Sequence, residues 1–273
     1  MRRDPHRPAG WNGGRAVTPS LRPAAMERRL RRGAYLLPSL FTTGNLLLGF
    51  VAIVRGLDGH FATAAVLIFI AGILDAFDGR LARITKTESD FGREYDSLAD
   101  CFTFGAAPAL LAYGWGLSGF GRVGWLIPLF YLVCGAVRLA RFNVQTKVID
   151  SRYFVGLPIP AAAGSICSIL FLADRFRELR ASNLVLALAL ITVGVLMVST
   201  FRYVSFKKID LSQRKSYRML LPLAAILFVI AYDPPLVFLT IAVLYTSSGP
   251  LGWLLGRLRH RPADGSPAEG RGE

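Results

Sequence analysis

Long apolar segments recur along this chain of 273 residues and are separated by short polar connections. A helix needs about 20 residues to cross the hydrocarbon core of a bilayer, and most of these segments approach or exceed that length. Hydrophobic residues make up 53% of the sequence, and their concentration in long blocks argues against a soluble fold. The sequence therefore predicts an all-α, polytopic membrane helix bundle.

The apolar blocks fit about eight transmembrane helices. They cover roughly residues 36–57, 61–84, 91–117, 123–142, 157–173, 184–206, 219–232 and 236–255. With the N-terminus in the cytoplasm, nearly all Lys and Arg residues fall on the cytoplasmic side, as the positive-inside rule asks. The exceptions are Arg55, Arg122, Arg175, Arg177 and Arg180. We expect a multi-pass protein of the cell (inner) membrane with both termini in the cytoplasm.

The two ends of the chain are polar. Residues 1–32 are rich in Arg, Pro and Gly, and residues 258–273 are similarly polar, so we expect disordered tails around a membrane-embedded domain at residues 33–257. The net charge is +14, but the basic residues lie where lipid headgroups, rather than nucleic acid, would meet them. Cys101, Cys134 and Cys167 lie within apolar blocks at spacings that fit neither a disulfide framework nor a metal site.

An acidic motif occupies the junction of the second and third predicted spans. It reads D-x2-D-G-x2-A-R-x8-G-x3-D-x3-D and consists of Asp75, Asp78, Gly79, Ala82, Arg83, Gly92, Asp96 and Asp100. Helical spacing puts the first two aspartates on one face of one helix and the last two on one face of the next. The polar connection between them is short, so the helices are antiparallel neighbours. We expect the four carboxylates to meet at the cytoplasmic ends of this pair, with Ser89 or Asp90 capping the second helix.

The charge of this motif asks for a cation. Acidic residues outnumber basic ones between Asp75 and Asp100, although the chain as a whole is strongly basic. Ionisable groups at membrane depth are costly and usually functional, and internal salt bridges would leave the acidic surplus unpaired. Carboxylate oxygens are the ligands that Mg²⁺, Mn²⁺ and Ca²⁺ prefer. The motif therefore predicts a divalent-metal site for phosphoryl chemistry.

The motif resembles the signature of the CDP-alcohol phosphatidyltransferases, with every position present at its spacing. These membrane enzymes move a phosphatidyl or related group from a CDP-linked donor to an alcohol and release CMP. The surrounding sequence resembles the bacterial integral-membrane branch that acts on serine, in the segments LPSLFTTGNLLLGF, DGRLARITKTESDFGREYDSLADCFTFGAAPA, CGAVRLARFNV and FVGLPIPAAAG. The resemblance implies transfer of the phosphatidyl group of CDP-diacylglycerol to L-serine, in a chain that forms a homodimer.

The resemblance also implies roles for individual residues. The ligands of two divalent ions, Mg²⁺ or Mn²⁺, would be Asp75, Asp78, Asp96 and Asp100, with Asp100 also the general base. Gly79 and Ala82 would line the cytidine pocket and Arg83 would contact the donor phosphate. The small size of Gly79 and Ala82 suits a pocket, although simple helix packing is an alternative. The planar guanidinium of Arg83 suits a phosphate, although contact with a lipid headgroup is an alternative. Thr43 and Asn45 are polar groups in an apolar span and are either donor contacts or partners in helix–helix hydrogen bonds.

The acceptor site is less constrained. Serine carries a carboxylate and an ammonium group, so its pocket needs a cation and an acceptor. Arg138, Arg141 and Asn143 are the candidates, although the arginines could instead bind lipid phosphate or anchor their helix. Two other functions stay open: the same chemistry with glycerol 3-phosphate or an inositol compound, and a divalent-cation transporter. Transport sites tend to lie near the bilayer midplane, whereas these acids flank a polar cytoplasmic turn.

Overall fold

The computed structural model describes residues 24–85, 89–145, 153–175, 182–204 and 232–259, and it is almost wholly helical there. The elements are α1 (Ala24–Leu57), α2 (Phe61–Thr85), α3 (Asp90–Asp100), a π-helix (Cys101–Ala106), α4 (Ala107–Trp115), a 3-10 turn (Leu117–Phe120), α5 (Arg122–Gln145), β1 (Tyr153–Val155), α6 (Ile159–Arg175), α7 (Ser182–Val198), β2 (Arg202–Val204) and α9 (Pro234–Arg259). The predicted all-α class is confirmed.

Three helices in the described ranges are long and apolar enough to cross a membrane, and they include Leu40–Leu57, Arg122–Val144 and Pro234–Leu255. Shorter apolar helices cover Phe61–Phe77, Ile159–Ala173 and Asn183–Val198. The predicted span at 219–232 lies outside the described residues except at its last position. A membrane-embedded bundle is thus plausible from the helices, and the total of about eight spans stays a prediction.

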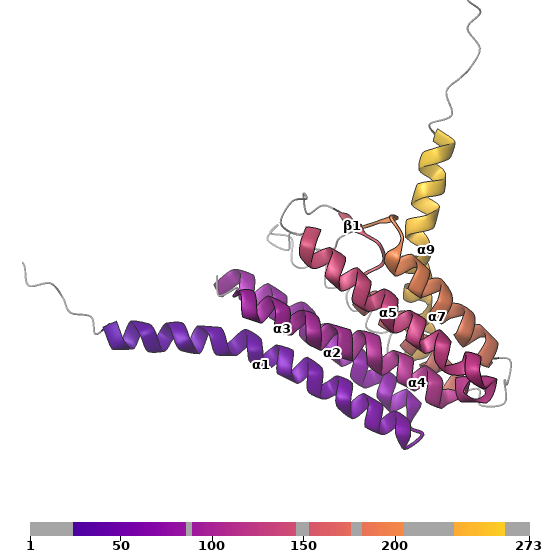
Figure 1. The fold of residues 1–273 in the computed structure, drawn as a ribbon, viewed down its shortest axis with the longest axis horizontal. Helices are drawn as coiled ribbons and strands as arrows, with labels where there is room; N and C mark the ends of the chain where they lie inside the picture. The colour runs from indigo at the N-terminus through magenta and orange to yellow at the C-terminus, as the bar shows by residue number, and fades with distance from the viewer. Residues whose placement is uncertain (1–23, 86–88, 146–152, 176–181, 205–231, 260–273) are drawn as a thin grey trace, which may run out of the picture.

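The core of the bundle lies around α6. Leu157, Ile159, Ile166, Cys167 and Leu170, on and just before this helix, are all fully buried. Helices α2, α7 and α9 pack against it, and α1 pairs lengthwise with α2. Alanines with no exposed surface line these contacts, which lets the backbones approach closely. Figure 1 shows α1, α2 and α3 side by side, with the N-terminal end of α1 and the C-terminal end of α9 projecting from the bundle.

The third predicted span is continuous but changes its winding. The chain keeps right-handed helical dihedrals from α3 through the π-helix into α4, where Pro108 occupies the first turn. Two hydroxyl groups hold the wider turn: Thr103 Oγ1 donates to the carbonyl of Asn45 on α1 at 3.1 Å, and Tyr131 Oη donates to that of Phe104 at 2.8 Å. Segments of π-helix are frequent at functional sites, and this one begins directly after Asp100.

Two predicted boundaries differ from the structure. Helix α1 begins at Ala24, inside the segment 1–32 expected to be a disordered tail, because Ala, Met, Glu, Arg and Leu between residues 24 and 32 are strong helix formers. Helix α7 ends at Val198 instead of residue 206. The chain then forms β2, which pairs antiparallel with β1 so that Phe154 opposes Tyr203. The three free cysteines lie at buried or half-buried positions, as expected for packing residues.

Candidate functional site

Three carboxylates, one from the second half of α2 and two from the second half of α3, lie close together. Ligand oxygens of Asp75, Asp96 and Asp100 all lie within 4.8 Å of one another. Asp100 is 9% exposed, and the other two are half-buried. Asp96 and Asp100 are one turn apart on α3. Helices α2 and α3 both pack against α1, and Asp75 of α2 lies beside these two aspartates. The sequence-based expectation that acids of both helices converge is confirmed for these three residues.

The rest of the motif lies on α2 beyond Asp75. Asp78 is one turn further along, so the helix places it on the same side as Asp75. The side chains of Asp78, Ala82 and Arg83 lie outside the described part of the structure, and their predicted roles stay predictions. A Cβ atom added at Gly79 would meet nothing within 4 Å, so open space adjoins α2 at this position.

Asn45 links α1 to the acidic centre. It is fully buried, and its Nδ2 donates a hydrogen bond of 3.2 Å to Oδ1 of Asp100. Its Oδ1 is buried too and has no hydrogen-bond partner among the residues that the structure describes. Thr43 lies two residues before Asn45 on α1, with its hydroxyl 3.0 Å from that of Tyr95 on α3. Both residues thus make helix–helix hydrogen bonds here, one of the two roles expected of them.

The start of α3 is fixed by local contacts. Ser89 is the N-cap, and its hydroxyl accepts a hydrogen bond of 2.9 Å from the amide of Gly92. Asp90 and Arg93 form an ion pair one turn apart, and the rings of Phe91 and Tyr95 stack with centroids 6.0 Å apart. The predicted cap is confirmed. These contacts are all local to residues 89–95 and stabilise the first turns of α3.

The three residues expected to bind serine lie near the C-terminal end of α5 in different surroundings. Arg138 is 6% exposed, and its guanidinium carbon lies 5.4 Å from the centre of the Phe142 ring. Arg141 donates hydrogen bonds of 2.8 to 3.3 Å to the carbonyl oxygens of Val155, Met197, Val198 and Ser199. Asn143 Nδ2 donates to Ser97 Oγ on α3 at 2.9 Å. Arg138 interacts electrostatically with Asp100 of the acidic centre.

Sequence reasoning missed the contribution of α9. Tyr245 on this helix interacts electrostatically with Arg138, and its ring lies 5.6 Å from that of Tyr203. Burial, with a smaller effect of Tyr245, raises the pKa of Tyr203 to about 12, so its hydroxyl stays protonated and donates to the carbonyl of Thr246 at 3.2 Å. No spacing in the sequence signals this approach, because α9 is far along the chain from the acidic motif.

The acidic centre has the chemistry of a divalent-cation site. Its donors are carboxylate oxygens from two helices, close enough for one ion to contact several of them. Such oxygens are preferred by Mg²⁺ and Mn²⁺, and like charges this close favour a bound cation. Asn45 adds a buried amide oxygen nearby, which is a further hard ligand. The residues therefore fit a divalent metal, without distinguishing Mg²⁺ from Mn²⁺.

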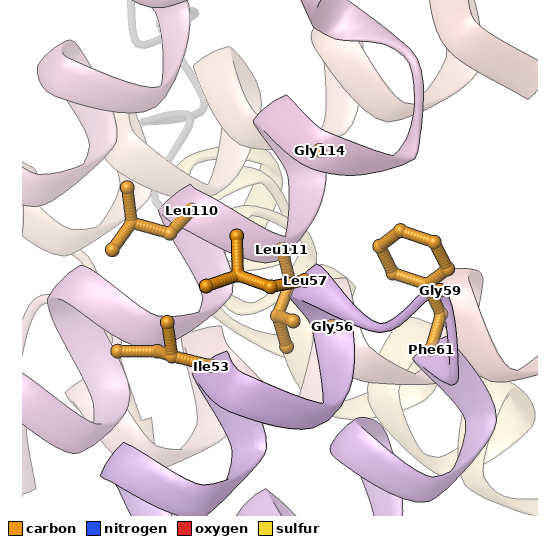
Figure 2. A pocket seen from close by; sticks show the side chains of 8 residues that line it. All are labelled: Ile53, Gly56, Leu57, Gly59, Phe61, Leu110, Leu111 and Gly114. Atoms are coloured by element: carbon orange, nitrogen blue, oxygen red, sulfur yellow. The ribbon is translucent and has the colours of Figure 1, made fainter.

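An apolar pocket of about 240 Å³ lies at the other end of the α1–α2 hairpin (Figure 2). Leu57, Phe61 and Leu111 are among its lining residues, together with Ile53, Leu110 and three glycines. At 1.5 Å per residue, Phe61 is about 21 Å along α2 from Asp75. None of the residues that line this pocket is charged.

Comparison with known proteins agrees with this geometry. The model of the CDP-alcohol phosphatidyltransferase family matches residues 35–196. A CDP-diacylglycerol–serine O-phosphatidyltransferase of Helicobacter pylori is 39% identical over 221 residues, which are 81% of this chain and 92% of that protein. One from Bacillus subtilis is 36% identical over 63% of this chain and 92% of its own length. An archaetidylserine synthase of Methanothermobacter thermautotrophicus is 37% identical over 61% of this chain and 69% of its own length.

Proposed function

The chain belongs to the CDP-alcohol phosphatidyltransferase family, and on that premise we propose that it transfers the phosphatidyl group of CDP-diacylglycerol to L-serine. The observation that carries the proposal is the convergence of Asp75, Asp96 and Asp100 within the family signature. The choice of serine follows the names of the relatives from H. pylori and B. subtilis. The products are phosphatidylserine and CMP.

In this reaction the hydroxyl oxygen of serine forms a bond to the phosphorus of the phosphatidyl group. The bond between that phosphorus and the oxygen bridging it to CMP breaks, and CMP leaves with the electron pair. The hydroxyl proton must pass to a base, which we assign to Asp100. Its position supports this role, because Asn45 holds one of its oxygens at 3.2 Å and so fixes the orientation of the carboxylate.

We assign Asp75, Asp78, Asp96 and Asp100 as ligands of two divalent ions, Mg²⁺ or Mn²⁺. When bound, such ions neutralise the charge of the donor's pyrophosphate and of the departing CMP. Holding these ligands in place is the task of α2 and α3, whose pairing supplies the positioning on which phosphoryl transfer depends. Gly79 and Ala82 would leave space for the cytidine, Arg83 would contact donor phosphate, and Thr43 and Asn45 would border the donor.

Arg138 is the residue to which we assign the serine carboxylate. It is buried, it carries the positive charge that a carboxylate needs, and it interacts with Asp100, the proposed base. In serine the hydroxyl and the carboxylate are separated only by Cβ and Cα, so their binding groups must be neighbours. Arg141 and Asn143 would then act around this pocket by holding its walls, through the hydrogen bonds that they make to α7, β1 and α3.

The acceptor is tested by incubating purified protein with CDP-diacylglycerol and one alcohol at a time. Serine, glycerol 3-phosphate and inositol are offered with Mg²⁺ or Mn²⁺, and CMP release is measured. We expect release that depends on serine and forms phosphatidylserine. Release with one of the other alcohols would reassign the acceptor. Divalent-ion flux into proteoliposomes without any nucleotide, and no CMP release, would instead support a transporter.

We further propose that the acidic centre faces the cytoplasm from the inner membrane and that the chain is a homodimer. The distribution of basic residues supports the orientation. A cysteine placed at exposed Asp90 in intact cells should resist a membrane-impermeant maleimide until the membrane is permeabilised. Labelling of this cysteine in intact cells would show that the acidic centre faces the outside of the cell. Light scattering of the protein in detergent measures the mass of the particle. A mass that corresponds to one chain would contradict the proposed homodimer.

A further inference from the structure

A buried hydrogen bond ties the π-helix (Cys101–Ala106) to α1. Thr103 is fully buried, and its Oγ1 donates to the carbonyl of Asn45 at 3.1 Å. That carbonyl lies within α1, where helical geometry already gives it an N–H partner, so the Thr103 hydroxyl is its second donor. The contact therefore fixes α1 against the π-helix more than it satisfies a polar group.

The same residue of α1 reaches the acidic centre with its side chain. Asn45 Nδ2 donates to Oδ1 of Asp100 at 3.2 Å, and Asp100 directly precedes the π-helix. Asn45 is thus held through its backbone by Thr103 and holds Asp100 through its side chain. All three residues are buried. Connected hydrogen bonds in a buried setting restrict one another, so the amide has little freedom to move relative to the carboxylate.

Close packing between α1 and the π-helix reinforces this contact. A Cβ atom added at Gly49, one turn after Asn45, would lie 2.6 Å from Oγ1 and 3.0 Å from Cα of Thr103. The absence of a side chain at Gly49 lets the two backbones approach each other closely. The hydroxyl of Thr103 can therefore reach a backbone carbonyl of α1.

The wider turn that contains Thr103 is also held from α5. Pro108 has no N–H, so it cannot donate to the carbonyl groups four and five residues before it, those of Phe104 and Thr103. The fully buried Tyr131 donates its hydroxyl to the Phe104 carbonyl at 2.8 Å. A side chain of α5 thus supplies a donor where the helix itself lacks one.

We propose that Thr103 is a positioning residue for Asp100 and acts on it through Asn45. This inference rests on the proposed function, in which Asp100 takes the proton of the acceptor hydroxyl. The hydroxyl of Thr103 keeps α1 in the place from which Asn45 orients the carboxylate. A small displacement of a catalytic group slows the chemical step, and it does so without weakening substrate binding. A purely structural hydroxyl would instead affect only the stability of the bundle.

The test compares wild type with Thr103→Val, which keeps the branched shape and removes the hydroxyl, at saturating Mg²⁺ or Mn²⁺. We expect kcat for CMP release to fall about tenfold, while the KM values for serine and CDP-diacylglycerol stay within about twofold. Thr103→Ser keeps the hydroxyl and should restore kcat to within about twofold of wild type. The matched control is Ser168→Ala, which removes a buried hydroxyl that donates to the Gly164 carbonyl on α6 at 2.6 Å. It should lower the unfolding temperature and leave kcat unchanged.

A double variant tests the route through Asn45. Asn45→Ala removes the amide that contacts Asp100, so adding Thr103→Val to it should lower kcat further by less than about twofold. A further loss of about tenfold in this background would show that Thr103 acts by another route.

Two other results would overturn the inference: wild-type kcat in Thr103→Val, or a loss that Thr103→Ser does not restore. If Thr103→Val does not fold, Thr103→Ala takes its place, because it removes the same hydroxyl without putting a methyl group beside the Asn45 carbonyl. No CMP release by wild-type protein would contradict the proposed function. Equal release by wild type and Thr103→Val would contradict only the role of Thr103.

Discussion

Asp100 is a buried carboxylate that is held by a hydrogen bond. Its carboxylate is 9% exposed and receives a hydrogen bond from Asn45, while Asp75 and Asp96 approach from the same side. At the scale of single residues, burial restricts the orientation of the Asp100 carboxylate. The neighbouring negative charges of Asp75 and Asp96 favour a bound cation. The hydrogen bond from Asn45 holds one of the two carboxylate oxygens in place.

Replacing Asp100 by Asn should lower kcat by about 100- to 10,000-fold, the range for loss of a general base. The Asn amide oxygen can still accept the hydrogen bond from Asn45, so the variant should fold. Turnover is measured by CMP release, and folding by thermal unfolding in detergent. The matched control is Asp90→Asn, an exposed acid on the same helix, which should retain activity. Near-normal turnover in Asp100→Asn would remove it as the base.

Arg138 and Arg141 lie one turn apart on α5 but should respond differently to substitution. Arg138→Ala should raise the serine KM at least tenfold, and more than the KM of CDP-diacylglycerol, because it removes the cation of the acceptor pocket. Arg141→Ala should chiefly lower the unfolding temperature, because it removes hydrogen bonds to the last carbonyls of α7 and to β1. Steady-state kinetics and thermal unfolding separate the two. A rise in serine KM alone for Arg141→Ala would return it to the pocket.

At the scale of elements, the sequence predicts the features that depend on long apolar blocks or on helical spacing. The apolar blocks predict the helix class, and the spacing of Asp75, Asp96 and Asp100 predicts their convergence on paired helices. The ribbon of β1 and β2 could not be predicted, because each strand has three residues and the partners are far apart in the chain. The π-helix was also missed, since it depends on hydroxyl contacts of Thr103 and Tyr131 with other backbone groups.

Gly156 is the residue on which the ribbon's connection to α6 depends. Its φ is +81°, and a Cβ atom there would overlap the carbonyl oxygen of Met197 and lie 2.6 Å from Nη2 of Arg141. Gly156→Ala should therefore combine backbone strain of about 1–2 kcal/mol with displacement of the Arg141 guanidinium. Gly59, at φ +80° with nothing within 4 Å of an added Cβ, is the matched control for strain alone. The unfolding temperature should fall further for Gly156→Ala than for Gly59→Ala. Equal decreases would contradict the close packing at Gly156.

Across the whole molecule, helices that are far apart in the chain are connected by contacts at the acidic centre. Asn45 joins α1 to Asp100, and Asn143 joins α5 to Ser97 beside Asp96. Arg138 on α5 interacts electrostatically with Asp100. The first two are hydrogen bonds between helices, which in a membrane are worth about 1 kcal/mol each. Stability and function therefore share the same contacts. A ligand that draws Asp75, Asp96 and Asp100 together should stabilise the bundle as a unit.

Divalent ions should accordingly stabilise the folded protein, and their removal by chelation should abolish turnover. At a free concentration of 100 times Kd, binding at one site adds about 2.7 kcal/mol to the free energy of unfolding. We expect Mg²⁺ or Mn²⁺ to raise the unfolding temperature of chelated wild type by several degrees. In Asp96→Asn this rise should vanish, while the metal-free variant should be no less stable than metal-free wild type, because one like charge has left the cluster. A full rise in Asp96→Asn, or none in wild type, would show that the ions do not bind among these carboxylates.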